Sequence, residues 1–176
     1  MTDLNIAPAP ATPTANVPAA SPLFLRETEV RRGIELVYFG YSDLIRGADA
    51  HLDKHGLGRA HHRSLYFIAR QPGLSVGALL RMLGITKQSL SRVLTELQQR
   101  GLVTQRVGER DRRQRLLTLT DAGLKLEHEL FELLRQRMAS AYAAAGQDAV
   151  SGFWKVLAEL LPDEQRGDIL NMQAHE

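Results

Sequence analysis

The stretch LSVGALLRMLGITKQSLSRVLTELQQRGLV, residues 74–103, decides the fold. Ser75 can cap a short helix that carries leucines on one side, and Gly84 allows a tight left-handed turn after it. Ile85 fills the corner of this turn, and Thr86 can cap a second helix. Two short helices joined in this way predict a helix-turn-helix, although an ordinary helical hairpin would share the capping and the polar exposure.

The second helix of this pair has two different faces. Its apolar residues recur at three- and four-residue steps, which predicts an inward face made of Leu90, Val93, Leu94 and Leu97. The opposite face, near the start of the helix, is rich in hydrogen-bond donors of the kind that read base edges and phosphates in a DNA major groove. The candidate DNA-binding residues of this helix are Thr86, Lys87, Gln88, Ser89 and Arg92.

A β-hairpin is expected directly after this helix, which ends at Gly101. The β-prone runs LVTQRV (102–107) and RLLTLT (115–120) are joined by GERDRRQ (108–114), which supplies turn residues and arginines. A hairpin that follows a recognition helix is a wing, and its tip can reach a minor groove. Narrow A·T-rich segments of that groove concentrate negative potential and attract arginine.

Four residues of the predicted hairpin tip are candidate DNA contacts. We predict that the Asp111 carboxylate holds the Arg113 guanidinium by a charge-assisted hydrogen bond and aims it at the DNA. Arg110 and Arg112 are the other two candidates, and for these arginines nonspecific attraction to phosphate is an equally good interpretation.

The pattern LGITKQSLSRVLTELQQRGLV followed by ERDRRQRLLTLTDAG resembles the MarR-type winged-helix regulators of bacteria. The first part is similar to that family's recognition helix. The second is similar to its Asp-x-Arg wing and to the Leu-Thr-x-x-Gly entry into the next helix, and the matching residues are Asp111, Arg113, Leu119, Thr120 and Gly123. Within the family the sequence is most similar to an alphaproteobacterial subgroup often labelled PetP-like.

The resemblance covers about Leu23 to Pro162 and implies a mainly α fold with a small β-hairpin wing, a winged helix-turn-helix with a lobe of terminal helices that forms a homodimer. The expected organisation is a disordered Pro/Ala-rich tail (1–22), an N-terminal dimerisation helix (23–58), a DNA-binding lobe (59–120), C-terminal dimerisation helices (121–162) and a flexible tail (163–176). A symmetric dimer matches pseudo-palindromic sites with half-sites about 10 base pairs apart. A monomer with a four-helix accessory lobe is the alternative.

Charge is strongly segregated along the chain. Between Arg59 and Arg115 there are 12 Lys or Arg and 3 acids, a net charge of +9, so the remaining residues carry −7 of the total of +2. A positive face of this kind favours a polyanionic partner, and an ordinary solvated surface is the alternative. Cysteine is absent, which excludes thiol chemistry and the peroxide sensing of some family members. Because no apolar run is long enough to span a membrane, we expect a cytoplasmic protein.

Enzymatic function finds little support in the sequence, because no phosphate-binding glycine loop, nucleophile elbow or HExxH motif is present. His51 and His55 stand four residues apart, with His61 and His62 following, but surface or packing roles explain them better than a metal site. No metal and no cofactor are therefore predicted.

The MarR resemblance also implies a small-molecule pocket between the dimer helices and the DNA-binding lobe. Core packing would explain the same aromatic and apolar side chains equally well. The candidate ligand-binding residues are Tyr38, Tyr41, Ser42, His61, His62 and Leu65.

The sequence thus predicts a homodimeric, sequence-specific regulator of transcription that binds double-stranded DNA, in this family most often a repressor, and whose affinity a small ligand can modulate. A metal- or ligand-responsive sensor that acts chiefly through protein contacts is the alternative. An RNA-binding module is disfavoured because the chain lacks an aromatic stacking platform.

Overall fold

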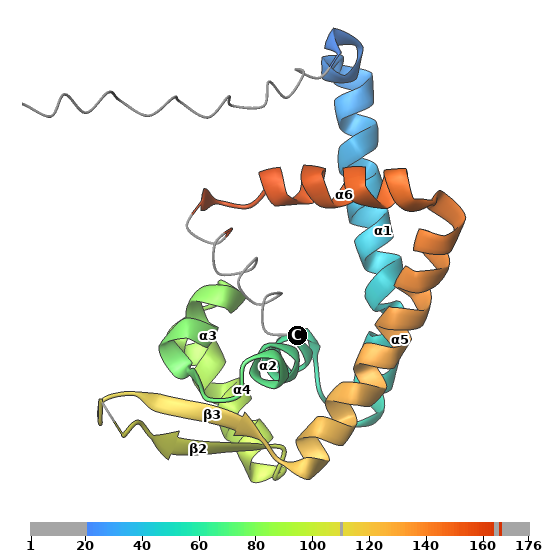
Figure 1. Cartoon of the computed structure of the whole chain (residues 1–176). Helices are drawn as coiled ribbons and strands as arrows, with labels where there is room; N and C mark the ends of the chain where they lie inside the picture. Colours follow the sequence, from blue (N-terminus) through green and yellow to red (C-terminus); the bar gives the residue numbers. More distant parts are fainter. Residues whose placement is uncertain (1–20, 110, 164–165, 167–176) are drawn as a thin grey trace, which may run out of the picture. The chain divides into compact units, whose positions relative to one another are not determined.

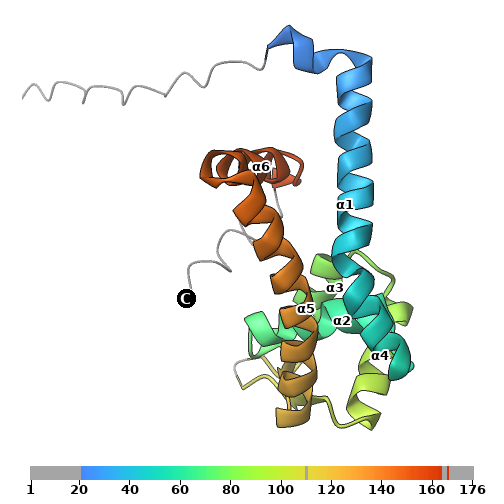
Figure 2. The ribbon, with the colours of Figure 1, turned by 90° about the vertical axis from the view of Figure 1, so that its right-hand side faces the viewer.

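The computed structural model describes residues 21–109, 111–163 and 166 (Figures 1 and 2). The elements, in chain order, are a 3-10 turn η1 (Pro22–Leu25), helices α1 (Glu27–Lys54) and α2 (Arg59–Arg70), strand β1 (Leu74–Ser75), helices α3 (Val76–Leu83) and α4 (Lys87–Gln99), strands β2 (Val103–Val107) and β3 (Arg115–Leu119), and helices α5 (Asp121–Ala145) and α6 (Gln147–Glu159). The predicted fold class, mainly helical with a small β wing, is confirmed.

The chain divides into two compact units, Met1–Phe39 and Gly40–Glu176, with the boundary inside α1. The described part of the first unit consists of η1 and the beginning of α1, and all of its residues are exposed. Many of them are large and apolar: Leu23, Phe24, Leu25, Val30, Ile34, Leu36, Val37, Tyr38 and Phe39. The tails predicted for 1–22 and 163–176 lie almost wholly outside the described residues.

The helix-turn-helix forms as its capping residues predict. The Ser75 hydroxyl accepts a hydrogen bond from the backbone N–H of Ala78 and begins α3, and Gly84 ends it in the left-handed conformation, with φ of 62°. The Thr86 hydroxyl then accepts from the N–H of Ser89 and begins α4. Because each cap satisfies a backbone donor that the helix cannot, the turn between the two helices is locally determined.

The second unit has one hydrophobic core, to which α4 contributes its predicted inward face. Leu90, Val93, Leu94 and Leu97 are all at most 7% exposed. They pack with apolar side chains from the other helices and from the sheet, among them Ala48, Leu52, Leu65, Ile68, Leu79, Leu83, Leu117, Leu126 and Leu130. Burying a leucine stabilises a fold by about 1.5–3 kcal/mol, so this core fixes which face of α4 points outward.

The sheet has three strands in the order β1-β3-β2, one more than the predicted hairpin. β2 and β3 pair antiparallel, with Val103 opposite Leu119 and Val107 opposite Arg115. The additional strand β1 is only two residues long and pairs with the other edge of β3, Leu74 opposite Leu117. The wing is therefore fastened to the helix-turn-helix at the residue where α3 begins, and its hairpin projects from the helical body (Figure 1).

The entry from the wing into α5 brings two backbone segments very close together. Thr120 caps α5 by accepting from the N–H of Gly123, and its hydroxyl donates to the carbonyl of Gly101 at 2.6 Å. A Cβ placed on Gly123 would lie 2.0 Å from the carbonyl oxygen of Leu102. That oxygen also accepts from the N–H of Thr120 at 3.1 Å. Only glycine fits at position 123, because strand β2 begins directly against the first turn of α5.

His62 on α2 is buried, at 7% exposure. Burial lowers the pKa of its imidazole below the ordinary value of 6.5, because the charged form would lose hydration, and Asp49 opposes this shift. No helix in the described ranges is long and apolar enough to cross a membrane.

We expect the free energy of unfolding to decrease as pH falls below about 6.5, because the unfolded chain then protonates His62 while the folded chain resists. Urea unfolding at about pH 7.5 and about pH 5.5 measures this loss. His62→Gln should show a smaller loss between the two pH values than the native chain, since the groups other than His62 are shared. Equal losses in the two proteins would contradict the assignment.

Candidate nucleic-acid interface

The outward face of α4 carries the predicted DNA-reading side chains. Lys87, Gln88, Ser89 and Arg92 are all exposed. Thr86 and Ser89 bond to each other through their hydroxyls at 2.8 Å, so both also serve the helix cap. Within the described part of the chain, Gln88 and Arg92 have no hydrogen-bond partner. Their donors are therefore available to an external acceptor, as recognition of base edges by a protein requires.

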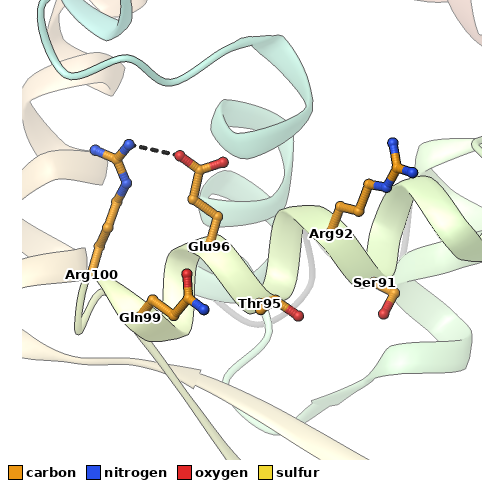
Figure 3. Close-up of a pocket in the computed structure, with 6 residues that line it drawn as sticks. All are labelled: Ser91, Arg92, Thr95, Glu96, Gln99 and Arg100. Carbon is orange, nitrogen blue, oxygen red and sulfur yellow. Dashed lines mark hydrogen bonds and ion pairs between the residues drawn. The ribbon is translucent and has the colours of Figure 1, made fainter.

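A second row of side chains on α4 was not predicted. Ser91, Thr95 and Gln99 stand at four-residue spacing beside the row of Arg92, Glu96 and Arg100 (Figure 3). Together these six side chains line a hollow of about 430 Å³ on the outer surface of the helix. Ser91 and Thr95 lie three and seven residues after Gln88, so helical periodicity places them on the same side of the helix. They extend the candidate surface toward the end of α4.

The wing forms, but Asp111 does not hold Arg113 in the predicted way. Asp111 is exposed, and its carboxylate accepts from the backbone N–H of Arg113 at 2.9 Å, with no bond to the guanidinium. Asp commonly bonds the N–H two residues ahead, which shapes a turn. The carboxylate therefore sets the backbone of the tip, and the guanidinium of Arg113 has no partner among the described residues. Arg112 is also exposed, whereas Arg110 lies outside the described residues.

The tip is closed by backbone contacts as well. The N–H of Gly108 donates to the carbonyl of Gln114 at 3.0 Å, and the N–H of Gln114 donates to the carbonyl of Asp111 at 3.0 Å. Beside them Arg106 pairs with Glu109 at 3.3 Å in an exposed bridge, which contributes little to stability because water screens it. The wing is thus a shaped turn that presents arginines.

The chain is similar in sequence to known proteins. The model of the MarR family matches residues 55–114. The HTH-type transcriptional regulator PetP of Rhodobacter capsulatus is 50% identical over 144 residues, which span 82% of this chain and 87% of PetP. The chain belongs to the MarR family.

Solved MarR-like structures share the fold. The chain superposes with a TM-score of 0.65 on Streptococcus pneumoniae FabT in complex with DNA, at 16% identity, covering 74% of this chain and 94% of FabT. It superposes with a TM-score of 0.64 on NadR in complex with 4-hydroxyphenylacetate, at 26% identity, covering 72% of this chain and 89% of NadR. The resemblance to MarR regulators, and to PetP among them, is confirmed, and the chain is a transcriptional regulator of that family.

The candidate ligand residues of this MarR-family chain are spread over different environments. Leu65 is fully buried in the core, and His62 is buried beside it on α2. Tyr41 and Ser42 are exposed on α1, and Tyr38 belongs to the first unit, where it is 69% exposed. Leu65 packs in the core, and the ligand assignment of all six residues stays a prediction.

Three further histidines of this MarR-family chain, His51, His55 and His61, form pairwise contacts. His51 lies 3.1 Å from Glu129 of α5, and its ring packs against that of His55. His61 bonds to Glu96 of α4 at 3.0 Å. In the described ranges no three His, Cys, Asp or Glu side chains are arranged to hold a metal ion.

Proposed function

We propose that the chain is a homodimeric, sequence-specific regulator that binds double-stranded DNA through α4 and the wing. The observation that carries the proposal is that Gln88 and Arg92 have no partner among the described residues and project from a helix whose opposite face is packed in the core. A helix presented in this way fits a major groove, and the segment around it carries the net charge of +9 that phosphates favour. The proposed DNA-binding residues are Thr86, Lys87, Gln88, Ser89 and Arg92 at α4 and Arg110, Asp111, Arg112 and Arg113 at the wing.

Dimerisation is part of the same proposal. In the first unit the apolar side chains of η1 and early α1 are exposed. In the second unit so are Phe153, Trp154 and Val156 of α6 and Leu160 at its C-cap. Apolar surface of this extent marks an interaction site in a regulator. A second copy of the chain would cover both sets and would place two recognition helices on a pseudo-palindromic operator.

The location of the regulator, its effect on transcription and its response to a ligand are part of the same proposal. We place the regulator in the cytoplasm, where it represses transcription without acting as an enzyme. A small ligand would modulate it, and the candidate ligand residues that the family resemblance implies remain Tyr38, Tyr41, Ser42, His61, His62 and Leu65. Selection of bound duplexes from a randomised library, followed by titration at several salt concentrations, tests the proposal. Enrichment of a palindromic sequence, with affinity falling steeply as salt rises, is expected. Failure to bind any duplex would favour a sensor that acts through protein contacts.

Replacing Gln88 or Arg92 by alanine should weaken binding to the selected operator by about 1–3 kcal/mol and broaden base preference, as loss of a base-edge contact does. Fluorescence anisotropy against the operator and its single-base variants measures both effects. A loss of equal size on all sequences would mean that the two side chains touch only phosphate.

At the wing, Arg113→Ala and Asp111→Ala should each weaken operator binding by about 1 kcal/mol, and the double variant should lose less than the sum, because the carboxylate shapes the turn that presents the arginine. Asp111→Asn retains the oxygen that accepts the Arg113 N–H and removes the charge. It should therefore bind at least as well as the native chain.

Titration of these variants against operators with A·T-rich or G·C-rich flanks completes the test. Loss should be greater on the A·T-rich flanks, where the narrow groove strengthens the attraction for an inserted arginine. Additive losses without flank preference would reduce the wing to a basic tether.

A further inference from the structure

Glu96 is the one acid in α4, and it stands between two arginines. Arg92, Glu96 and Arg100 follow at four-residue spacing and project to the same side of the helix (Figure 3). Either arginine has the spacing for an ion pair with Glu96. The carboxylate pairs with Arg100, whose Nη2 lies 2.6 Å from Oε1, while Arg92 keeps no partner among the described residues.

The other carboxylate oxygen of Glu96 bonds to α2. The Nε2 atom of His61 lies 3.0 Å from Oε2. The Nδ1 atom of the same ring lies 3.1 Å from the backbone nitrogen of Gly58, whose N–H donates to it. Because Nδ1 accepts a hydrogen bond it carries no proton, so Nε2 carries the proton and donates it to the carboxylate. His61 therefore links the first turn of α2 to the middle of α4.

Arg100 extends this linkage to the connection between α1 and α2. Its Nη1 donates to the carbonyl of His55 at 2.6 Å. The hydrogen bond from Arg100, followed by the interactions with His61, lowers the pKa of the Glu96 carboxyl below its ordinary value. Both oxygens of an ionised carboxylate are thus engaged, one toward His61 and one toward Arg100, and each partner is itself bonded to the backbone at the start of α2 or just before it.

We propose that Glu96 is a positioning residue that sets α4 against the start of α2 and leaves Arg92 free to reach a base, an inference that rests on the DNA-binding function proposed above. Electrostatics alone gives the opposite expectation. A carboxylate on a DNA-facing helix repels phosphates, so its removal should strengthen binding to every duplex. A positioning role instead requires that its removal weaken the preference for the operator.

The chain offers a matched control in Glu109, an acid of the same basic lobe whose side chain is 88% exposed and, among the described residues, pairs only with Arg106. Glu96→Gln and Glu109→Gln each remove one negative charge and keep the size of the side chain. Affinity for the selected operator and for a random duplex is measured for both variants at one salt concentration. Glu109→Gln should leave the ratio of the two affinities unchanged, whereas Glu96→Gln should lower it about tenfold.

The ring of His61 gives a second readout. Long-range ¹H–¹⁵N NMR spectra of the native chain should show His61 protonated at Nε2 alone, and Glu96→Gln should shift its resonances or mix the tautomers. Should Glu96→Gln fail to fold, Arg100→Met serves in its place. It removes the other partner of the carboxylate and should also lower the ratio.

Two results would overturn the proposal. If Glu96→Gln matches Glu109→Gln, with an unchanged ratio and unchanged His61 resonances, the Glu96 contacts are incidental to recognition. If Arg100→Met is the variant measured, an unchanged ratio has the same meaning. Failure of the native chain to bind any duplex would contradict the proposed function itself. The titration of the native chain, which precedes that of the variants, shows this separately.

Discussion

Replacing Gly123 by alanine is expected to lower the free energy of unfolding by about 3 kcal/mol or more. The added methyl would stand 2.0 Å from the carbonyl oxygen of Leu102, so the backbone must move. That carbonyl accepts from Thr120, so the movement also loosens the junction of β2, β3 and α5. Urea denaturation followed by circular dichroism measures the change in the free energy of unfolding. Operator affinity should fall as well, because the wing is anchored at this junction.

Gly77→Ala is the control for this experiment. Gly77 also lies in a helix of the same lobe, but a Cβ there would meet only the end of the flexible Arg81 side chain, at 4.0 Å. Alanine is the better helix former by about 1 kcal/mol, so this variant should be as stable as the native chain or slightly more stable. If both alanine variants are equally stable, the close approach at Gly123 is not a constraint on the fold.

Introducing glutamate at Val156 and Leu160 together is expected to convert the proposed homodimer into monomers and to weaken operator binding at least about a hundredfold, because each half-site must then be bound separately. The two side chains are 63% and 67% exposed in the single chain. The monomer fold should therefore tolerate the change, while a dimer interface would bury unpaired charge.

Analytical ultracentrifugation and operator titration test this second prediction together. Ser151→Glu adds a charge to α6 at an exposed polar position and is the control, expected to stay dimeric. The bond from Trp154 Nε1 to the Tyr142 hydroxyl at 2.8 Å, which holds α6 against α5, is retained in both variants. A double variant that remains dimeric with native affinity would show that the apolar residues of α6 lie outside the interface.

Local sequence signals predicted most of the fold correctly. The caps at Ser75 and Thr86, the left-handed turn at Gly84 and the helical spacing of leucines each depend on residues within one or two turns. Strand β1 was missed because two residues carry no alternation of polarity. Its existence depends on pairing with Leu117, far along the chain, and no local pattern reports such a contact.

The candidate site was predicted less completely. The outward face of α4 follows from its inward leucines, and the same spacing could have indicated Ser91 and Thr95. The spacing of Asp111 and Arg113 correctly indicated an interaction but not its kind, since a guanidinium and a backbone N–H are both within reach. The contact of Glu96 with His61 joins residues 35 positions apart and appears only when α2 and α4 pack together.

The way the sheet closes the wing has a consequence for how such regulators can diversify or be engineered. Residues 108–114 are bounded by the pair of Val107 with Arg115, and the bond from Gly108 to Gln114 ties their ends together. The register of this hairpin is set by β3, which also pairs with β1 on its other side. The loop can therefore be replaced without changing the pairing of the strands. Grafting a loop of the same length from another regulator should alter how operator affinity depends on flanking sequence and on salt, while the base preference proposed for α4 stays the same.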